Sequence, residues 1–195
     1  MARASVILLL LLPIFYLVGT AKSASTTTTT NFIETSCRAT TYPQVCIQSL
    51  SSYATSIQQS PRQLAQASLS VSLTRAKSAK TFVTKLAKFK GLKSREYGAI
   101  KDCLEEMGDS VDRLSKSVTE LKDMGKSKGQ DFLWHMSNVE TWVSAALTDD
   151  NTCLDGFSGK ALNGKIKSSV RAQVLNVAQC TSNALALCNR FAGKH

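Results

Sequence analysis

Four segments of this 195-residue chain carry apolar residues at steps of mostly three and four, and this spacing constrains the fold more than any other feature. The steps keep the apolar side chains on one side of an α-helix, whereas a strand would alternate. The four stripes are Ala65, Leu69, Leu73, Ala76, Ala79, Val83 and Leu86; Ile100, Leu104, Met107, Val111, Leu114, Val118 and Leu121; Phe132, Met136, Val139, Val143 and Ala146; and Val170, Val174, Val177, Thr181, Ala184, Cys188 and Phe191.

Four narrow stripes predict an all-α protein whose four long helices pack as a bundle. Gly91, then Gly125 and Gly129, and finally residues 151–164 separate the helices. Such short connections favour antiparallel neighbours in up-down-up-down order. Before Pro61, two shorter helical pieces over about 31–39 and 43–54 predict a helical hairpin that precedes the bundle.

The N-terminus has the layout of a secretory signal peptide. Arg3 precedes a 13-residue apolar run over residues 6–18, and small residues follow it. The run is shorter than the roughly 20 residues that a membrane span needs, although an uncleaved anchor stays an alternative. We expect residues 1–24 to be the signal peptide, 25–30 a flexible Thr-rich leader, 31–191 the folded domain (hairpin 31–54, bundle 61–191) and 192–195 a tail. A protein processed in this way is secreted and extracellular.

In an oxidising compartment the six cysteines favour disulfides. Cys37 and Cys46 lie on the two pieces of the hairpin. Cys103 lies early in the second long helix and Cys153 just past the third, and in an antiparallel pair those two ends meet. The expected disulfides are therefore Cys37–Cys46 and Cys103–Cys153.

The remaining cysteines, Cys180 and Cys188, share the last helix. Eight helical residues rise by about 12 Å, and a disulfide needs Cα atoms within about 7 Å. The two thiols therefore cannot pair with each other on a straight helix. A buried free thiol is the favoured interpretation of Cys188, and an intermolecular disulfide through Cys180 is the alternative.

The formal charge of +10 falls to +8 without Arg3 and Lys22, leaving 22 basic and 14 acidic residues. Outside the cell this excess favours acidic polymers or an acidic protein surface as partners, and a solvated lysine-rich helix face explains it equally well. Nucleic acid is not an expected partner, nor is a membrane once the signal is removed. The sequence contains none of the common nucleotide-binding, zinc-protease or hydrolase motifs. We expect no enzymatic activity, no metal and no cofactor.

The expected end of the third long helix is unusually polar. Thr148, Asp149, Asn151 and Thr152 lie there, and acidic groups at a helix C-terminus oppose the macrodipole. A solvated turn accounts for this composition. The alternative is that these four residues bind a partner.

Three regions resemble the plant invertase/pectin methylesterase inhibitor domain. The first runs from Cys37 to Cys46 (CRATTYPQVC), with eight residues between the cysteines. The second, DCLEEM over 102–107, contains the third cysteine. The third combines SNVETWVSAALT over 137–148 with TCLDGF over 152–157, which contains the fourth cysteine. The resemblance extends from about residue 31 to 191.

The resemblance implies a four-helix bundle with an N-terminal hairpin and the same two disulfides. It also implies a secreted inhibitor that blocks the active cleft of pectin methylesterase in a 1:1 complex. Residues 126–132 (KSKGQDF) lack the Pro-Lys-Phe motif of several invertase inhibitors, which favours pectin methylesterase. Invertase inhibition is the first alternative, and non-inhibitory binding of anionic pectin through the lysines is the second.

Overall fold

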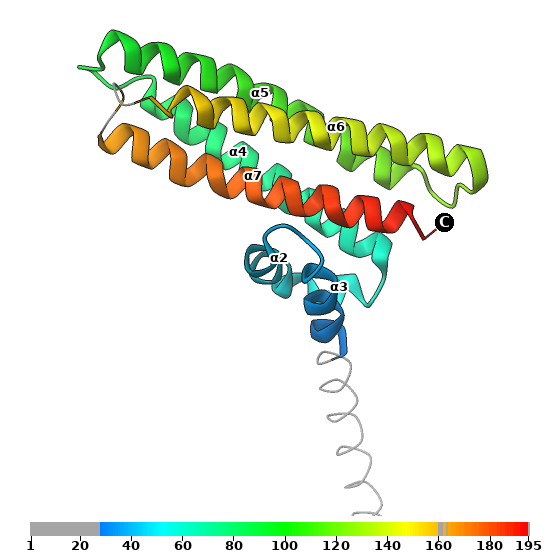
Figure 1. Ribbon diagram of the computed structural model, residues 1–195. Helices are drawn as coiled ribbons and strands as arrows, with labels where there is room; N and C mark the ends of the chain where they lie inside the picture. Colours follow the sequence, from blue (N-terminus) through cyan, green and yellow to red (C-terminus); the bar gives the residue numbers. More distant parts are fainter. Residues whose placement is uncertain (1–27, 160–161, 163, 195) are drawn as a thin grey trace, which may run out of the picture.

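The computed structural model describes residues 28–159, 162 and 164–194. The described chain is helical and contains no strand within these ranges. The long helices are α4 (Pro61–Leu86), α5 (Ser94–Asp123), α6 (Gly129–Gly156) and α7 (Lys165–Ala192). They lie side by side in alternating directions (Figure 1). The predicted all-α, up-down-up-down four-helix bundle is confirmed.

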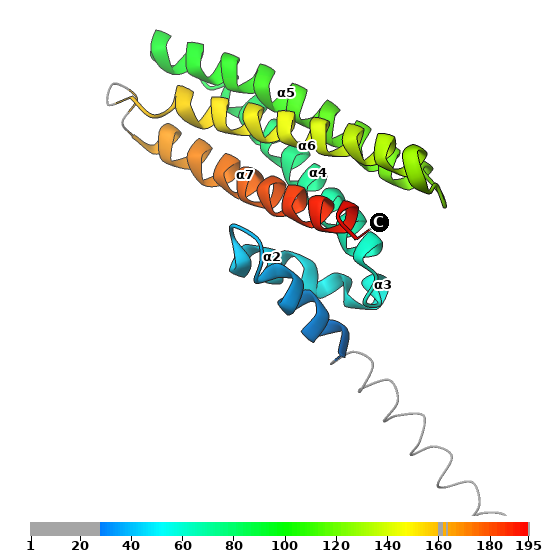
Figure 2. The ribbon, with the colours of Figure 1, turned by 45° about the vertical axis from the view of Figure 1, so that its right-hand side comes forward.

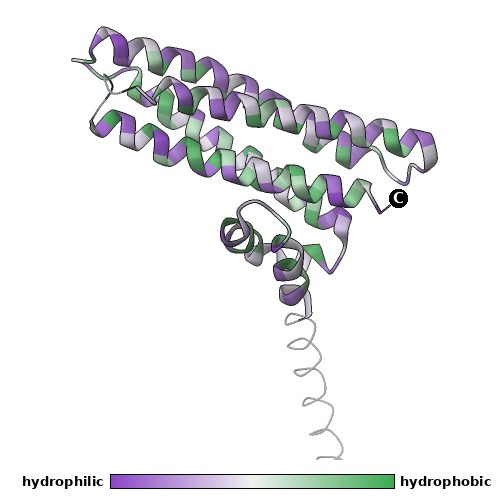
Figure 3. Ribbon diagram, in the orientation of Figure 1, coloured by the Kyte–Doolittle hydropathy of each residue, from purple (hydrophilic) through white to green (hydrophobic). Residues whose placement is uncertain are grey.

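Each long helix packs against two others, so that α4 and α6 both contact α5 and α7. Polar and apolar residues alternate along every long helix (Figure 3), as expected where one face is buried and the other is in water. The stripes predicted from the sequence supply the inner faces. Of those stripe residues, Leu69, Leu114, Val139 and Val174 have exposed fractions of 0%.

Local signals fix where the long helices begin and end. Ser60 Oγ accepts a hydrogen bond from Gln63 N at 3.3 Å, and Pro61 opens α4 at a position that needs no N–H donor. At the start of α5, Glu96 accepts a hydrogen bond from Lys93 N at 2.9 Å. Gly91 has a φ of +91°, a backbone conformation that a side chain would strain, and turns the chain between the two helices.

The hairpin lies across α4 and α7 at the side of the bundle (Figures 1 and 2). Its first helix covers residues 28–37 and is followed by α2 (Pro43–Leu50), a short 3₁₀ turn (Ser51–Tyr53) and α3 (Ala54–Ile57). The helix includes residues 28–30, which the sequence assigned to a flexible leader. Thr29, within this segment, is 5% exposed. The predicted signal peptide, residues 1–24, lies outside the described residues.

A buried asparagine attaches the hairpin to the bundle. Asn183 of α7 is 3% exposed, and its side-chain amide forms two hydrogen bonds with the backbone of Tyr42. Tyr42 N donates to Asn183 Oδ1 at 3.0 Å, and Asn183 Nδ2 donates to Tyr42 O at 2.9 Å. Both polar atoms of the side chain and both backbone groups of Tyr42 are thereby satisfied.

We expect Asn183→Ala to lower the free energy of unfolding by about 1–3 kcal/mol, since it leaves the N–H of Tyr42 without a partner. It also removes one of the two hydrogen bonds that Tyr42 O accepts, the other coming from Cys46 N at 3.0 Å. The loss should appear as faster amide hydrogen exchange in residues 28–57 than in the four long helices. Gln173→Ala, at an exposed position of the same helix, is the control. Equal exchange rates throughout the variant would show that Asn183 stabilises the bundle as a whole.

Candidate target-binding site

The second half of α6 carries the residues that the sequence singled out for binding, but α6 does not end there. It continues to Gly156, so Asn151, Thr152 and Cys153 lie inside the helix. The expected break over residues 151–164 begins six residues later than predicted. The two acidic residues are therefore not at a helix C-terminus, and their cost against the macrodipole does not arise.

Asp149 and Asp150 point into the bundle, with exposed fractions of 5% and 0%. Asp149 Oδ1 accepts a hydrogen bond from Arg113 Nη1 of α5 at 2.8 Å, and Arg113 also lies 3.8 Å from Asp109. Burial raises the pKa of Asp149 to about 6 although the Arg113 charge lowers it. The carboxylate of Asp149 is therefore buried and bonded to Arg113, and its contact with a partner stays a prediction.

Asp150 lies between three helices. Its Oδ1 accepts from Ser110 Oγ of α5 at 2.7 Å, and its Oδ2 lies 3.0 Å from Thr181 Oγ1 of α7. Thr181 Oγ1 also donates to Val177 O at 3.0 Å. Burial raises the pKa of Asp150 to about 7, although the hydrogen bonds from Ser110 and Thr181 lower it. Asp150 therefore connects α5, α6 and α7 inside the core.

The inward direction of Asp149 and Asp150 leaves Thr148, Asn151 and Thr152 on the outer face. These three residues are exposed, and their spacing of three and four places them on one side of α6. Thr148 Oγ1 donates to Ser144 O at 3.1 Å and Thr152 Oγ1 donates to Thr148 O at 2.9 Å. Both hydroxyl oxygens keep lone pairs that can accept hydrogen bonds from a partner.

Thr148 also lines an open groove of about 550 Å³ between α6 and α7. Glu140, Ser144 and Asn189 contribute polar atoms to the same groove, and Leu185 contributes an apolar one. Burial raises the pKa of Glu140. A groove of this kind offers hydrogen-bonding groups at fixed positions on two rigid helices.

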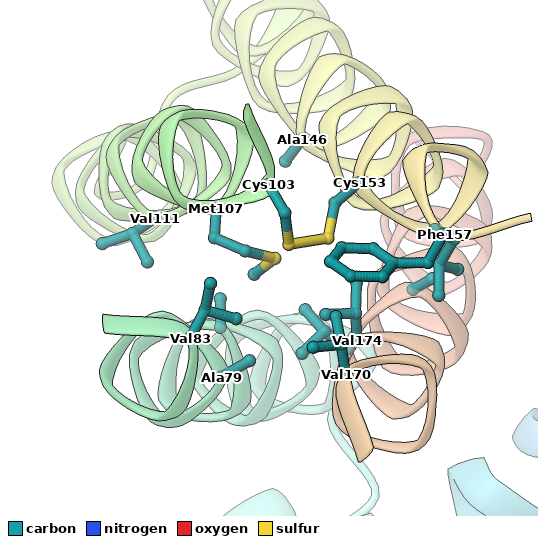
Figure 4. Packing of buried hydrophobic residues seen from close by; sticks show 14 of the residues in the cluster. Ala79, Val83, Cys103, Met107, Val111, Ala146, Cys153, Phe157, Val170 and Val174 are labelled. Carbon is teal, nitrogen blue, oxygen red and sulfur yellow. A yellow bond between two sulfur atoms is a disulfide. The ribbon is translucent and has the colours of Figure 1, made fainter. Parts of the chain in front are cut away.

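The disulfide Cys103–Cys153 fixes this half of α6 against the start of α5, with the Cα atoms 4.4 Å apart. Figure 4 shows it in the core, between Ala146 of α6 and the ring of Phe157. The second disulfide, Cys37–Cys46, closes the hairpin. Both pairings agree with the sequence prediction.

Cys180 and Cys188 are buried free thiols. Cys188 has an exposed fraction of 0%, as the sequence favoured, and burial raises the pKa of its thiol well above the ordinary range. Cys180 is 4% exposed, and burial raises its pKa too. An intermolecular disulfide through Cys180 would first require exposure of its buried sulfur.

His135, the one histidine in the described chain, joins α5 to α6. Its Nδ1 lies 2.9 Å from Glu120 Oε1, which also accepts from Asn138 Nδ2 at 3.0 Å. The Asn138 hydrogen bond is the largest influence that lowers the pKa of Glu120. Within the described ranges, no group of three or more His, Cys, Asp and Glu side chains is placed to hold a metal ion.

Sequence reasoning missed the partners of the two buried acids. Ser110 and Arg113 lie on α5 and Thr181 on α7, far from Asp149 and Asp150 in the chain. One signal was available, because Thr181 interrupts the apolar stripe of the last helix. A hydroxyl in such a stripe needs a hydrogen-bonding partner inside the core.

The fold and the site define a class of protein: a disulfide-stapled helical bundle that presents a rigid polar surface along one helix. The sequence model of the family described as plant invertase/pectin methylesterase inhibitor matches residues 31–187. The chain belongs to this family.

The relatives agree with that assignment. The "21 kDa protein" of Daucus carota is 61% identical over 173 residues, which cover 89% of this chain and 90% of the relative. "Pectinesterase inhibitor 11" of Arabidopsis thaliana is 57% identical over 166 residues, covering 85% and 82%. A crystal structure of a mutant pectin methylesterase inhibitor from Arabidopsis has the same fold, with a TM-score of 0.64 at 21% identity, covering 78% of this chain and 92% of that one.

Proposed function

We propose that this protein inhibits pectin methylesterase by forming a stoichiometric complex that covers the active cleft of the enzyme. The similarity to a protein named as a pectinesterase inhibitor, 57% identical over 166 residues, carries this proposal. The family defines an inhibitor rather than an enzyme. Inhibition in this way would regulate the de-esterification of cell-wall pectin.

The structure supports a binding role through its rigidity. Two disulfides and three hydrophobic core clusters hold the helices, so a surface on α6 loses little conformational freedom when it binds. Secretion into the cell wall is part of the same proposal, since disulfides persist in oxidising compartments. Among the described helices, none is long and apolar enough to cross a bilayer.

Titration of the purified, oxidised protein against a plant pectin methylesterase and a cell-wall invertase tests the proposal. We expect methylesterase activity to fall linearly to an end point near one inhibitor per enzyme, and invertase activity to be unaffected. Inhibition of invertase alone would assign the chain to the other target class of its family.

We further propose that Thr148, Asn151 and Thr152 contact the enzyme. Thr148→Arg with Asn151→Arg places two long charged side chains on this face, and we expect inhibition to weaken about tenfold or more, a loss of about 1.4 kcal/mol or more. The thermal midpoint should stay nearly unchanged because both positions are exposed. An inhibition titration beside a thermal melt measures both effects.

The matched control is Ser78→Arg with Thr81→Arg on the exposed face of α4. This pair has the same spacing and adds the same charge, and Thr81 Oγ1 makes the same kind of bond to a carbonyl four residues earlier. Equal inhibition by the two double variants would remove the outer face of α6 from the interface.

A further inference from the structure

A second concave site lies at the opposite end of the bundle from the Cys103–Cys153 disulfide. A pocket of about 540 Å³ opens where α4 and α6 begin and α7 ends. Figures 1 and 2 both place the start of α4, the α5–α6 turn and the C-terminal end of α7 together at this end. The volume falls within the range of small-molecule binding sites.

The walls of this pocket are strongly basic. Arg62, Lys126, Lys128 and Lys194 line it, and the described lining residues include no carboxylate. Lys126, Lys128 and Lys194 are exposed and have no acidic partner within the part of the chain that the structure describes. Three lysines around one pocket without a counter-charge favour a ligand with more than one negative charge.

The floor of the pocket is apolar. Phe132 and Phe191 pack edge to face, with ring centroids 5.6 Å apart, and are 4% and 6% exposed. Met124, 4% exposed, lies beside them and also lines the pocket. A ligand that fits here therefore combines an apolar face with charges at its edge.

Arg62 holds the turn that carries two of the lysines. Its guanidinium donates to Gly125 O, and Nη2 donates to Leu121 O at 3.2 Å and to Lys122 O at 3.4 Å. These acceptors are the last carbonyls of α5 and its turn, which carry the negative end of the helix dipole. Arg62 thus fixes the wall of the pocket, while the three lysines stay available to a ligand.

We propose that this pocket binds a short anionic saccharide, a de-esterified uronate oligomer. Such an oligomer carries one carboxylate per ring, which matches several separate ammonium groups, and its C–H faces match an apolar floor. The identity of the sugar rests on the proposed function, because removal of methyl esters from pectin creates these carboxylates. The inhibitor would bind the product of the enzyme at a site distant from the outer face of Thr148, Asn151 and Thr152.

Isothermal titration of the full-length oxidised protein with a short, fully de-esterified galacturonate oligomer tests this proposal. We expect saturable binding that weakens with added salt and disappears with the fully methyl-esterified oligomer. Lys126→Gln with Lys128→Gln should weaken binding about fivefold or more, the effect of two lost lysine–carboxylate contacts. Lys77→Gln with Lys85→Gln, exposed on α4, lowers the net charge equally and should leave binding unchanged.

Equal losses in the two double variants would overturn the proposal, since binding would then follow net charge and not the pocket. Equal affinity for inorganic phosphate or for a polyglutamate peptide of matched charge would overturn the saccharide assignment. Inhibition of the methylesterase by wild-type protein that does not bind the oligomer refutes this inference alone. Oligomer binding without inhibition refutes the proposed function and leaves the pocket assignment in place.

Discussion

Cys103→Ala with Cys153→Ala is expected to lower the free energy of unfolding by about 4 kcal/mol. The disulfide closes a loop with a sequence separation of 50, and in the chain-entropy model a loop of this length contributes about that much stability. The sulfurs also fill space beside Met107 and Phe157 in the core (Figure 4), so their removal costs packing as well. Alanine is chosen because both positions are buried and a serine hydroxyl there would need a partner.

Cys37→Ala with Cys46→Ala is the comparison variant. Its loop has a sequence separation of 9, for which the same model gives about 2.7 kcal/mol. Chemical denaturation of both variants and the wild type measures the difference. Because the hairpin disulfide lies outside the four-helix bundle, its loss should also affect residues 28–57 more than α5 and α6. A smaller loss of unfolding free energy on removal of Cys103–Cys153 than on removal of Cys37–Cys46 would contradict this prediction.

The bundle was predictable from the sequence because its signals are local. The glycines between helices indicate where each helix ends. The a/d stripe of the second helix indicates which of its faces is buried. The pairing of Cys103 with Cys153 then follows from antiparallel order alone. The early start of the first helix, at residues 28–30, was not predictable, because a run of threonines has low helix propensity.

The site was predicted only in part, for a physical reason. Residues 148–153 look like a polar helix end when read alone, since two adjacent acids are rarely buried. Their burial depends on Ser110, Arg113 and Thr181, which come from α5 and α7 and meet them only in the folded bundle. The pattern of one helix cannot show whether a carboxyl faces water or a hydroxyl group on another helix. The outer residues, by contrast, are exposed as the polar composition indicated.

The buried carboxyl of Asp150 should make the protein more stable in acid than at alkaline pH. Its pKa is raised from 3.8 to about 7 in the fold, so the folded state binds a proton more strongly than the unfolded chain. The stability that Asp150 contributes is therefore fully present below about pH 4 and is lost as the pH rises through about 7. Asp149, with a pKa of about 6, contributes in the same direction. We expect both carboxyls to lose their contributions to stability between pH 4 and pH 8, with the larger loss from Asp150.

The hydrogen bonds show why the neutral form fits. A protonated Oδ2 of Asp150 can donate to Thr181 Oγ1, whose own hydrogen then goes to Val177 O, while Oδ1 still accepts from Ser110. The ionised form has no hydrogen to donate, so the Thr181 hydroxyl must serve two acceptors with one proton. The neighbouring charge of Asp149 also repels an ionised Asp150 and so raises the pKa of Asp150.

Asp150→Asn tests this account, because the amide reproduces the protonated carboxyl: Nδ2 donates to Thr181 and Oδ1 accepts from Ser110. We expect the variant to match the wild type at pH 4 and to exceed its stability by about 2–3 kcal/mol at pH 8. Urea denaturation across this range measures both curves, and Asp112→Asn, exposed on α5, is the control. A variant whose stability falls with pH as steeply as the wild type would show that Asp150 is not the group that titrates. If the variant instead keeps only a shallow fall in stability with pH, we assign that fall to Asp149, whose charge Arg113 partly balances.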